Sequence, residues 1–261
     1  MKLISLGSGS SGNFYFISHE NHALIIDSGV AIRQLSRNIR SFNLPMHQVE
    51  AILVTHDHWD HVRTVAVLSK QYRIPVYASQ EVFRGMNTNP RLVQKVPETL
   101  RHPFSVGDSL EIGPYKVATF DVPHDASRNN GYYITTAGAS LCLMTDIGHI
   151  TDELRTYIRQ SENLIIEANY DLEMLERGRY PQFLKDRIKS GIGHLSNTQT
   201  AAVLTECLSD SIKQVWLCHL SEENNRPEKA LSTVGESLAS AGLSPQLRVL
   251  PRRNPSGIFE L

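Results

Sequence analysis

The sequence predicts a protein of the mixed α/β (α+β) class in which two β-sheets pack face to face and helices cover their outer faces. Three observations lead to this prediction. The first third of the chain consists of short runs of β-branched and aromatic residues separated by turns. The middle is rich in consecutive strands, and the last part alternates strands with helices. Two sheets packed face to face would bury all of these strands.

In the first third, the pattern predicts strands at residues 3–6, 14–17, 23–26, 51–54 and 75–78. A Gly/Ser loop at 7–12 follows the first strand. A helix is expected at 30–42, because Ile32, Leu35 and Ile39 fall on one helical face. A second helix is expected at 62–72.

In the rest of the chain, strands are expected at 109–112, 115–120, 132–135, 140–144, 164–167, 214–218 and 246–250. Helices are expected at 152–160, 181–190, 196–209 and 227–241. Ser196 followed by Gln199 has the spacing of a capping box, which predicts a helix start at Ser196.

The composition is that of an ordinary globular protein. The chain has 261 residues, 41% of them hydrophobic, and a net charge of -1. No linker or repeat divides it, so a single domain over 1–261 is expected. Three scattered cysteines, no apolar leader and no apolar run long enough for a bilayer indicate a cytoplasmic protein that needs no membrane. No protein partner is evident from the sequence.

Chemistry-bearing side chains are concentrated at residues 56–61, directly after an expected strand. The run is His-Asp-His-Trp-Asp-His, in a chain that holds 11 histidines. A polar loop with exposed histidines is the ordinary alternative. However, imidazole and carboxylate are common metal ligands. His56 and His58 can face one position, while Asp60 and His61 face another nearby, so one segment can supply two metal ions.

Other candidate ligands follow strands elsewhere in the chain. These residues are Asp27, His124, Asp146 and His219. Each alone is more often a turn or capping residue. Together with the histidine run they form a coherent set.

This set of residues, in this order, resembles the metallo-β-lactamase superfamily over nearly the whole chain. The resemblance implies a four-layer αββα sandwich of the metallo-β-lactamase type, with two metal ions at one edge. It implies that one ion is held by His56, His58 and His124, and the other by Asp60, His61 and His219. Asp146 would bridge the ions, and Asp27 would orient a ligand histidine or the bridging water.

A narrower resemblance, to the YycJ/WalJ branch of that superfamily, rests on the runs 6–13, 193–197 and 219–221. It implies a 5′-to-3′ exonuclease activity on DNA. Two positions depart from the pattern: Trp59 stands where a small residue is expected, and Tyr170 where histidine is expected. Neither is an expected ligand, so the departures bear on substrate choice.

Three residues are expected to take part in the chemistry: Asp60, Asp146 and His194. His194 is either a local structural residue before the capped helix or a proton donor and phosphate contact. The glycine- and histidine-containing loops also supply candidate substrate contacts, which are Ser11, Asn13, Asn169, His194 and Ser221. For the loop at 7–12, a simple connecting turn is an equal alternative.

A basic segment runs from Arg177 to Lys189. A solvated helix face is its ordinary interpretation, and phosphate contacts are the alternative. Tyr180 and Phe183 within it could stack on bases, although such residues more often belong to the core.

The function predicted from these residues is that of a two-metal hydrolase, most simply a phosphodiesterase that acts on DNA. A phosphodiesterase or ester hydrolase of a small metabolite is the second hypothesis, which the near-neutral charge favours slightly. A metal-binding redox or regulatory module is the third. The ligand set suits two divalent ions, either Zn, Mn or Fe.

Overall fold

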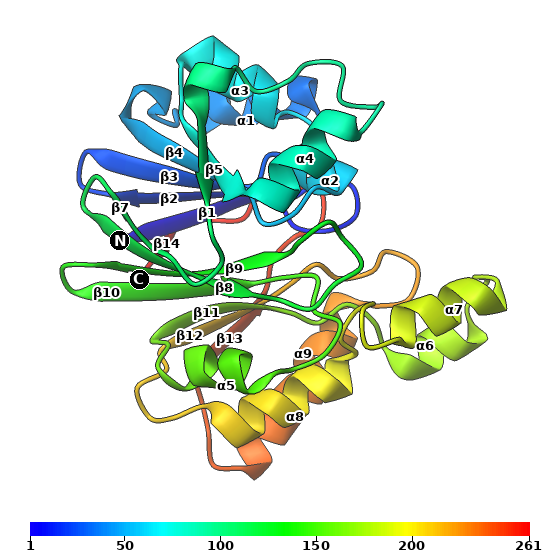
Figure 1. Cartoon of the computed structure of the whole chain (residues 1–261). Helices are drawn as coiled ribbons and strands as arrows, with labels where there is room; N and C mark the ends of the chain where they lie inside the picture. Colours follow the sequence, from blue (N-terminus) through cyan, green and yellow to red (C-terminus); the bar gives the residue numbers. More distant parts are fainter.

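The computed structural model describes residues 1–261 and has the expected four layers, with two sheets between two layers of helices (Figure 1). The first seven-stranded sheet contains, in spatial order, β14 (Phe259–Glu260), β1 (Lys2–Gly7), β2 (Phe14–His19), β3 (His22–Ile26), β4 (Val49–Leu53), β5 (Val76–Ser79) and β6 (Arg101–Phe104). The second contains β13 (Gln246–Val249), β12 (Gln214–Cys218), β11 (Asn163–Glu167), β10 (Ala139–Met144), β9 (Asn130–Thr136), β8 (Tyr115–Asp121) and β7 (Ser109–Ile112). The predicted fold class is confirmed.

Helices cover the outer face of each sheet (Figure 1). Over the first sheet lie α1 (Ile32–Ser41), α2 (Trp59–Val62), α3 (Val65–Tyr72) and α4 (Gln80–Thr88), with the short 3-10 helices η1 (Met46–Gln48) and η2 (Glu98–Leu100) in the connections. Over the second lie α5 (Asp152–Arg159), α8 (Asn197–Cys207) and α9 (Pro227–Ser240). A further pair, α6 (Leu172–Arg177) and α7 (Gln182–Lys189), projects from one side of the sandwich.

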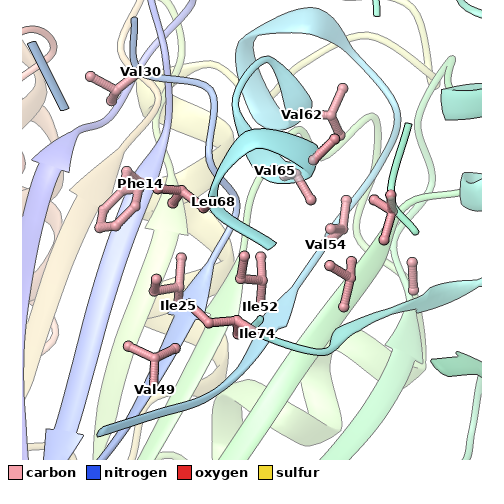
Figure 2. Close-up of a cluster of buried hydrophobic side chains, with 14 of the residues drawn as sticks. Phe14, Ile25, Val30, Val49, Ile52, Val54, Val62, Val65, Leu68 and Ile74 are labelled. Carbon is pink, nitrogen blue, oxygen red and sulfur yellow. The ribbon is translucent and has the colours of Figure 1, made fainter. Parts of the chain in front are cut away.

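Most strands are buried on both faces, and alternate residues contribute to different clusters. On β4, Ile52 faces the helices, where it joins Val65 and Leu68 of α3 (Figure 2). Its neighbour Leu53 faces the opposite sheet and joins Trp216 of β12. This period of two is the expected geometry of a strand. It gives the molecule a core between the sheets and one under each layer of helices.

Both sheets contain parallel strands next to one another. In the first sheet β3, β4, β5 and β6 are parallel, and in the second β10, β11, β12 and β13 are parallel. Parallel neighbours end at the same edge of a sheet, which is where α/β proteins bind ligands. The residues that follow β3, β4, β10 and β12 are therefore brought close together.

The structure departs from the predicted elements in a few places. The helix expected at 62–72 is interrupted between α2 and α3, because the backbone and hydroxyl of Thr64 both donate hydrogen bonds to the carbonyl of Ser28. The helices α4 and α6 were not predicted. Neither was β6, whose Pro103 is tolerated because β6 is an edge strand. The capping box at Ser196 is present as predicted.

The three cysteines, Cys142, Cys207 and Cys218, are buried and free, as expected for core residues. No helix of the protein combines the length and apolar character needed to cross a bilayer.

Candidate metal centre

The candidate ligands converge at one edge of the sandwich because the strands that carry them end there. Asp27 follows β3 and His56 follows β4 in the first sheet, while Asp146 follows β10 and His219 follows β12 in the second. The carboxyl ends of neighbouring parallel strands thus bring residues that are far apart in the sequence to one place.

Three of these residues have a left-handed backbone conformation. The φ angles are 58° at Asp27, 56° at Asp146 and 53° at His219. Such conformations are uncommon for residues other than glycine and cost on the order of 1–3 kcal/mol each. They occur where the chain leaves a strand and directs a side chain into the site. The unfavourable backbone conformations are therefore found at the residues that form the site.

The histidine run is held in place by backbone hydrogen bonds. The carbonyl of Asp60 accepts from the amide of Asn13 at 2.8 Å, and the carbonyl of His61 accepts from the amide of Ser28 at 2.7 Å. Gly29 packs against this segment so closely that an added Cβ would lie 1.6 Å from the Asp60 carbonyl oxygen. The loops after β1 and β3 therefore fix the position of α2.

The side chains form four overlapping groups of potential metal ligands, and two of them match the expected ligand sets. One of these two consists of His56, His58 and His124, and the other of Asp60, His61 and His219. The remaining two groups both contain Asp146. In each group, one ligand atom per residue lies within 4.8 Å of the others.

Asp146 lies between the two groups. Its Oδ1 is 3.8 Å from Nε2 of His124, in the first group, and its Oδ2 is 3.3 Å from Nε2 of His61, in the second. Oδ1 also lies 3.3 Å from Nδ1 of His219, so this one carboxylate faces both groups.

The donor set fits divalent metal ions. The Nε2 atoms of His56, His124 and His219 are buried and have no hydrogen-bond partner. Buried polar atoms without partners are rare in folded proteins, and here three of them belong to the candidate ligands. Imidazole nitrogens and carboxylate oxygens are the ligands of Zn, Mn and Fe.

The charge state of the groups depends on burial and on their neighbours. Burial, reinforced by the nearby His61, holds the pKa of His56 well below its usual range, so its imidazole is neutral as a ligand must be. Burial alone would lower the pKa of His61, but Asp27 and Asp146 outweigh it and raise this pKa to about 9. Burial would raise the pKa of Asp146, yet the surrounding histidines hold it well below its usual value.

The other ring nitrogen of several ligands is fixed by a neighbour. Nδ1 of His61 lies 2.7 Å from Oδ2 of Asp27, whose oxygens also accept from the backbone and hydroxyl of Thr55. Nδ1 of His124 lies 3.0 Å from the carbonyl oxygen of Gly193. Such partners set the tautomer of a ligand histidine, so that its second nitrogen is the one available to a metal ion.

Glu167, the last residue of β11, has the same kind of role but was not among the predicted site residues. Its fully buried Oε1 lies 3.1 Å from Nδ1 of His219 and 2.8 Å from Nδ1 of His194. Its Oε2 accepts from the backbone amides of Ile147 and Leu195. The sequence signal that could have identified Glu167 is an acidic residue at the end of a buried strand, in the strand that comes between those preceding Asp146 and His219.

His194 lies beside the ligand groups. Its Nδ1 is 3.8 Å from Oδ1 of Asp146, in addition to its contact with Glu167. Burial would lower the pKa of His194, but Glu167 outweighs it and raises this pKa. The structure therefore places a histidine that can carry a proton next to the candidate metal centre.

The candidate substrate contacts have different surroundings. Asn13 is fully buried: its amide group bonds to the backbone of Gly9, and its Nδ2 lies 2.8 Å from Nε2 of His61. Asn169 is also buried and donates to the carbonyl of His219. Ser11 is exposed, whereas Ser221 is half-buried. The two asparagines thus have internal partners.

A cavity of about 190 Å³ adjoins the centre. His194 and His219 line it, together with Leu184, Arg187 and Ile188 of α7. Among the candidate substrate contacts, Asn169, His194 and Ser221 line this cavity.

Most cations of the basic segment are already paired within the protein. Arg177 pairs with Glu173, Lys189 with Glu176, and Arg187 with Asp125. Lys185 is buried and donates to the carbonyl of Glu176. Arg179 is exposed and has no ion pair. The segment is therefore a largely neutralised surface with one free cation.

Comparison with known proteins gives one family. The family model described as "Beta-lactamase superfamily domain" matches residues 22–220. The chain is 34% identical to the exodeoxyribonuclease YycJ of Bacillus anthracis, over 91% of this chain and 89% of the relative. It is also 34% identical to the exodeoxyribonuclease WalJ of Streptococcus pneumoniae, over 91% of this chain and 88% of the relative.

Solved structures agree with the fold. The metallo-beta-lactamase fold protein YhfI from Bacillus subtilis superposes with a TM-score of 0.72 at 15% identity, covering 99% of both chains. The Zn(2+)-bound PqqB from Methylobacterium extorquens superposes with a TM-score of 0.73 at 17% identity, covering 100% of both chains. At these identities the likeness concerns the fold.

Proposed function

The chain belongs to the beta-lactamase superfamily, and we propose that within it the protein is a two-metal phosphodiesterase that removes nucleotides from DNA in the 5′-to-3′ direction. The observation that carries this proposal is the position of Asp146 between two ligand groups. The 34% identity to two exodeoxyribonucleases over nine-tenths of the chain supports DNA as the substrate. The three buried free cysteines support a cytoplasmic location.

In this proposal His56, His58 and His124 would hold one ion and Asp60, His61 and His219 the other, and the Asp146 carboxylate would serve both. Two divalent ions would lower the pKa of a water molecule and neutralise charge on the phosphodiester. Zn, Mn and Fe all suit this mixed set of imidazole and carboxylate ligands.

The chain's own residues perform the remaining tasks. The carboxylates of Asp60 and Asp146 would orient the attacking water by accepting hydrogen bonds from it, and one of them would take the single proton that the water loses. His194, whose pKa is raised chiefly by Glu167 against the effect of burial, donates a proton to the leaving oxygen. Ser221 and Asn169 line the cavity where the substrate would lie, and Asn13 and Asp27 hold His61 in place.

A direct test uses linear duplex DNA labelled at either 5′ or 3′ ends, together with covalently closed circular DNA, in the presence of Mn or Zn. We expect early release of the 5′ label and no loss of the circle. His58→Ala and Asp146→Ala should abolish turnover, while the exposed controls His47→Ala and Asp210→Ala should retain it. Retained turnover in both site variants would exclude the two-metal mechanism.

The role of His194 has its own test, because the need for a proton depends on the leaving group. His194→Ala should slow DNA cleavage by about 10²–10⁴-fold. It should slow hydrolysis of bis-p-nitrophenyl phosphate much less, since p-nitrophenolate leaves without a proton. Equal losses on both substrates would rule out the proton-donor role.

A phosphodiesterase of a small metabolite is the second candidate. The small cavity and the neutralised basic segment favour it. Cleavage of bis-p-nitrophenyl phosphate with no degradation of DNA under any of the metals would select this alternative.

A further inference from the structure

The cavity next to the candidate metal centre is lined by residues of two kinds. Tyr180, Leu184 and Ile188 are aromatic or aliphatic. Asn169, His194 and Ser221 are polar, and Asp125 and Arg187 add a charged pair to the lining. A nucleotide has the same division, because its base has apolar faces while its sugar and phosphate are polar.

The size of the cavity limits what it can hold. Sites for drug-sized molecules have volumes of about 300–1,000 Å³, whereas this cavity has about 190 Å³. Because His194 and His219 line it directly, whatever occupies it is adjacent to the reacting phosphate. The cavity therefore suits one nucleotide flanking the scissile bond rather than a continuous strand.

Phe183 belongs to α7, the helix that supplies Leu184, Arg187 and Ile188 to the cavity lining, although it is not itself a lining residue. It precedes the lining residue Leu184, and it lies one helical turn before Arg187, which also lines the cavity. Nevertheless 74% of Phe183 is exposed, so packing in the core does not account for an aromatic residue at this position. The Arg187 side chain beside it is tied to Asp125, which stabilises this end of α7 against the loop that carries His124.

We propose that this cavity is the subsite for the 5′-terminal nucleotide of the DNA strand and that Phe183 stacks on the base of the second nucleotide. The inference rests on the proposed function and adds to it the way in which a strand end is recognised. An aromatic ring stacks on any base, so the device requires no particular sequence. Recognition by stacking also requires few positively charged side chains, which agrees with the basic segment, where most cations are already paired within the protein.

The stacking contact is tested by binding to the metal-free protein, which does not depend on turnover. A single-stranded oligonucleotide carries 2-aminopurine at its second position from the 5′ end. Wild type should quench its fluorescence. Phe183→Ala should abolish the quenching and weaken affinity by about fivefold to 150-fold, and Phe183→Tyr should restore both. Ile258→Ala, which removes an exposed residue just before β14, is the matched control and should behave as wild type.

The cavity itself is tested by competition. A deoxynucleoside 5′-monophosphate should inhibit DNA degradation by wild type. Leu184→Trp, which fills the cavity, should weaken this inhibition by at least about tenfold and should lower DNA turnover relative to that of bis-p-nitrophenyl phosphate. Circular dichroism and thermal unfolding establish that the variant is folded.

The outcomes separate this inference from the proposed function. If wild type degrades DNA but Phe183→Ala still quenches the fluorescent base and Leu184→Trp keeps full nucleotide inhibition, the subsite assignment is wrong and the nuclease function stands. If wild type degrades no DNA, the proposed nuclease function is wrong, and the subsite assignment, which rests on it, is wrong as well. Quenching of a base at the 3′ end instead of the 5′ end would also overturn the assignment.

Discussion

Oδ2 of Asp27 lies 2.7 Å from Nδ1 of His61, and both side chains are completely buried. The pair joins the end of β3 to the first turn of α2, which are separated by more than thirty residues in the sequence. Because Asp27 accepts the Nδ1 proton, Nε2 is the nitrogen of His61 that faces Asp146 and that a metal ion would bind in place of a proton. This contact is the basis of the first prediction.

Asp27→Asn should weaken binding of the metal ion at the Asp60, His61 and His219 group by about 10–100-fold. Asparagine tolerates the left-handed backbone at this position, so the fold should be retained. Titration calorimetry should show one weakened and one nearly unchanged binding step. Asp210→Asn, on the exposed surface, should leave both steps unchanged. Two unchanged steps in Asp27→Asn would contradict the role of Asp27.

Glu167→Gln should act on metal binding through the tautomer of His219. A glutamine can satisfy the amides of Ile147 and Leu195 with its oxygen, but its nitrogen then faces Nδ1 of His219 as a donor. The proton of His219 would move to Nε2, the nitrogen that faces Asp60. We expect a loss of metal affinity of about 10–100-fold, measured by competition with a chelator.

The matched control is Glu162→Gln, just before the start of the same strand, where the carboxylate pairs with Lys213 on the surface. It should leave metal affinity unchanged. Equal affinities for the two variants would show that Glu167 has no part in metal binding. Nitrogen chemical shifts of the histidine rings report the tautomer directly.

Removal of metal should lower the thermal stability. Without an ion, buried nitrogens of His56, His124 and His219 lack partners, and ligands that bind only the folded state stabilise it by mass action. At a metal concentration one hundred times its dissociation constant, the gain per site is about 2.7 kcal/mol. A chelator should lower the melting temperature and added Zn or Mn should raise it in steps. An unchanged melting temperature would mean that no ion binds to the folded chain.

Gly29→Ala should damage the site through the backbone. The added Cβ would lie 1.6 Å from the carbonyl oxygen and 2.1 Å from the carbonyl carbon of Asp60, so α2 would have to shift. We expect a destabilisation of about 1–3 kcal/mol, typical of overpacking, together with weaker metal binding. Gly257→Ala, where the Cβ meets nothing within 4 Å, is the control. Urea unfolding measures the stability of both variants. Equal stabilities would contradict the packing argument.

Sequence patterns predicted the elements with strong local signals. The capping box fixes the start of α8 at Ser196, and the β-branched runs mark the buried strands. The helices α4 and α6 were not predicted, because each is short and offers only a few apolar residues from which a helical face can be recognised. The break between α2 and α3 depends on a hydrogen bond from Thr64 to Ser28, thirty-six residues earlier, and no local pattern contains it.

The residue types and their order along the chain determined by themselves that a histidine run and several strand-terminal acids and histidines were available for metal chemistry. Only the tertiary structure decided which of them meet. The pairing of parallel strands brings Asp146, Glu167 and His219 to one edge, and the packing of two sheets sets that edge against the loop after β4. Partners such as Glu167, and the exposed position of Phe183 beside a cavity, follow from distances between segments remote in sequence, which local propensity does not contain.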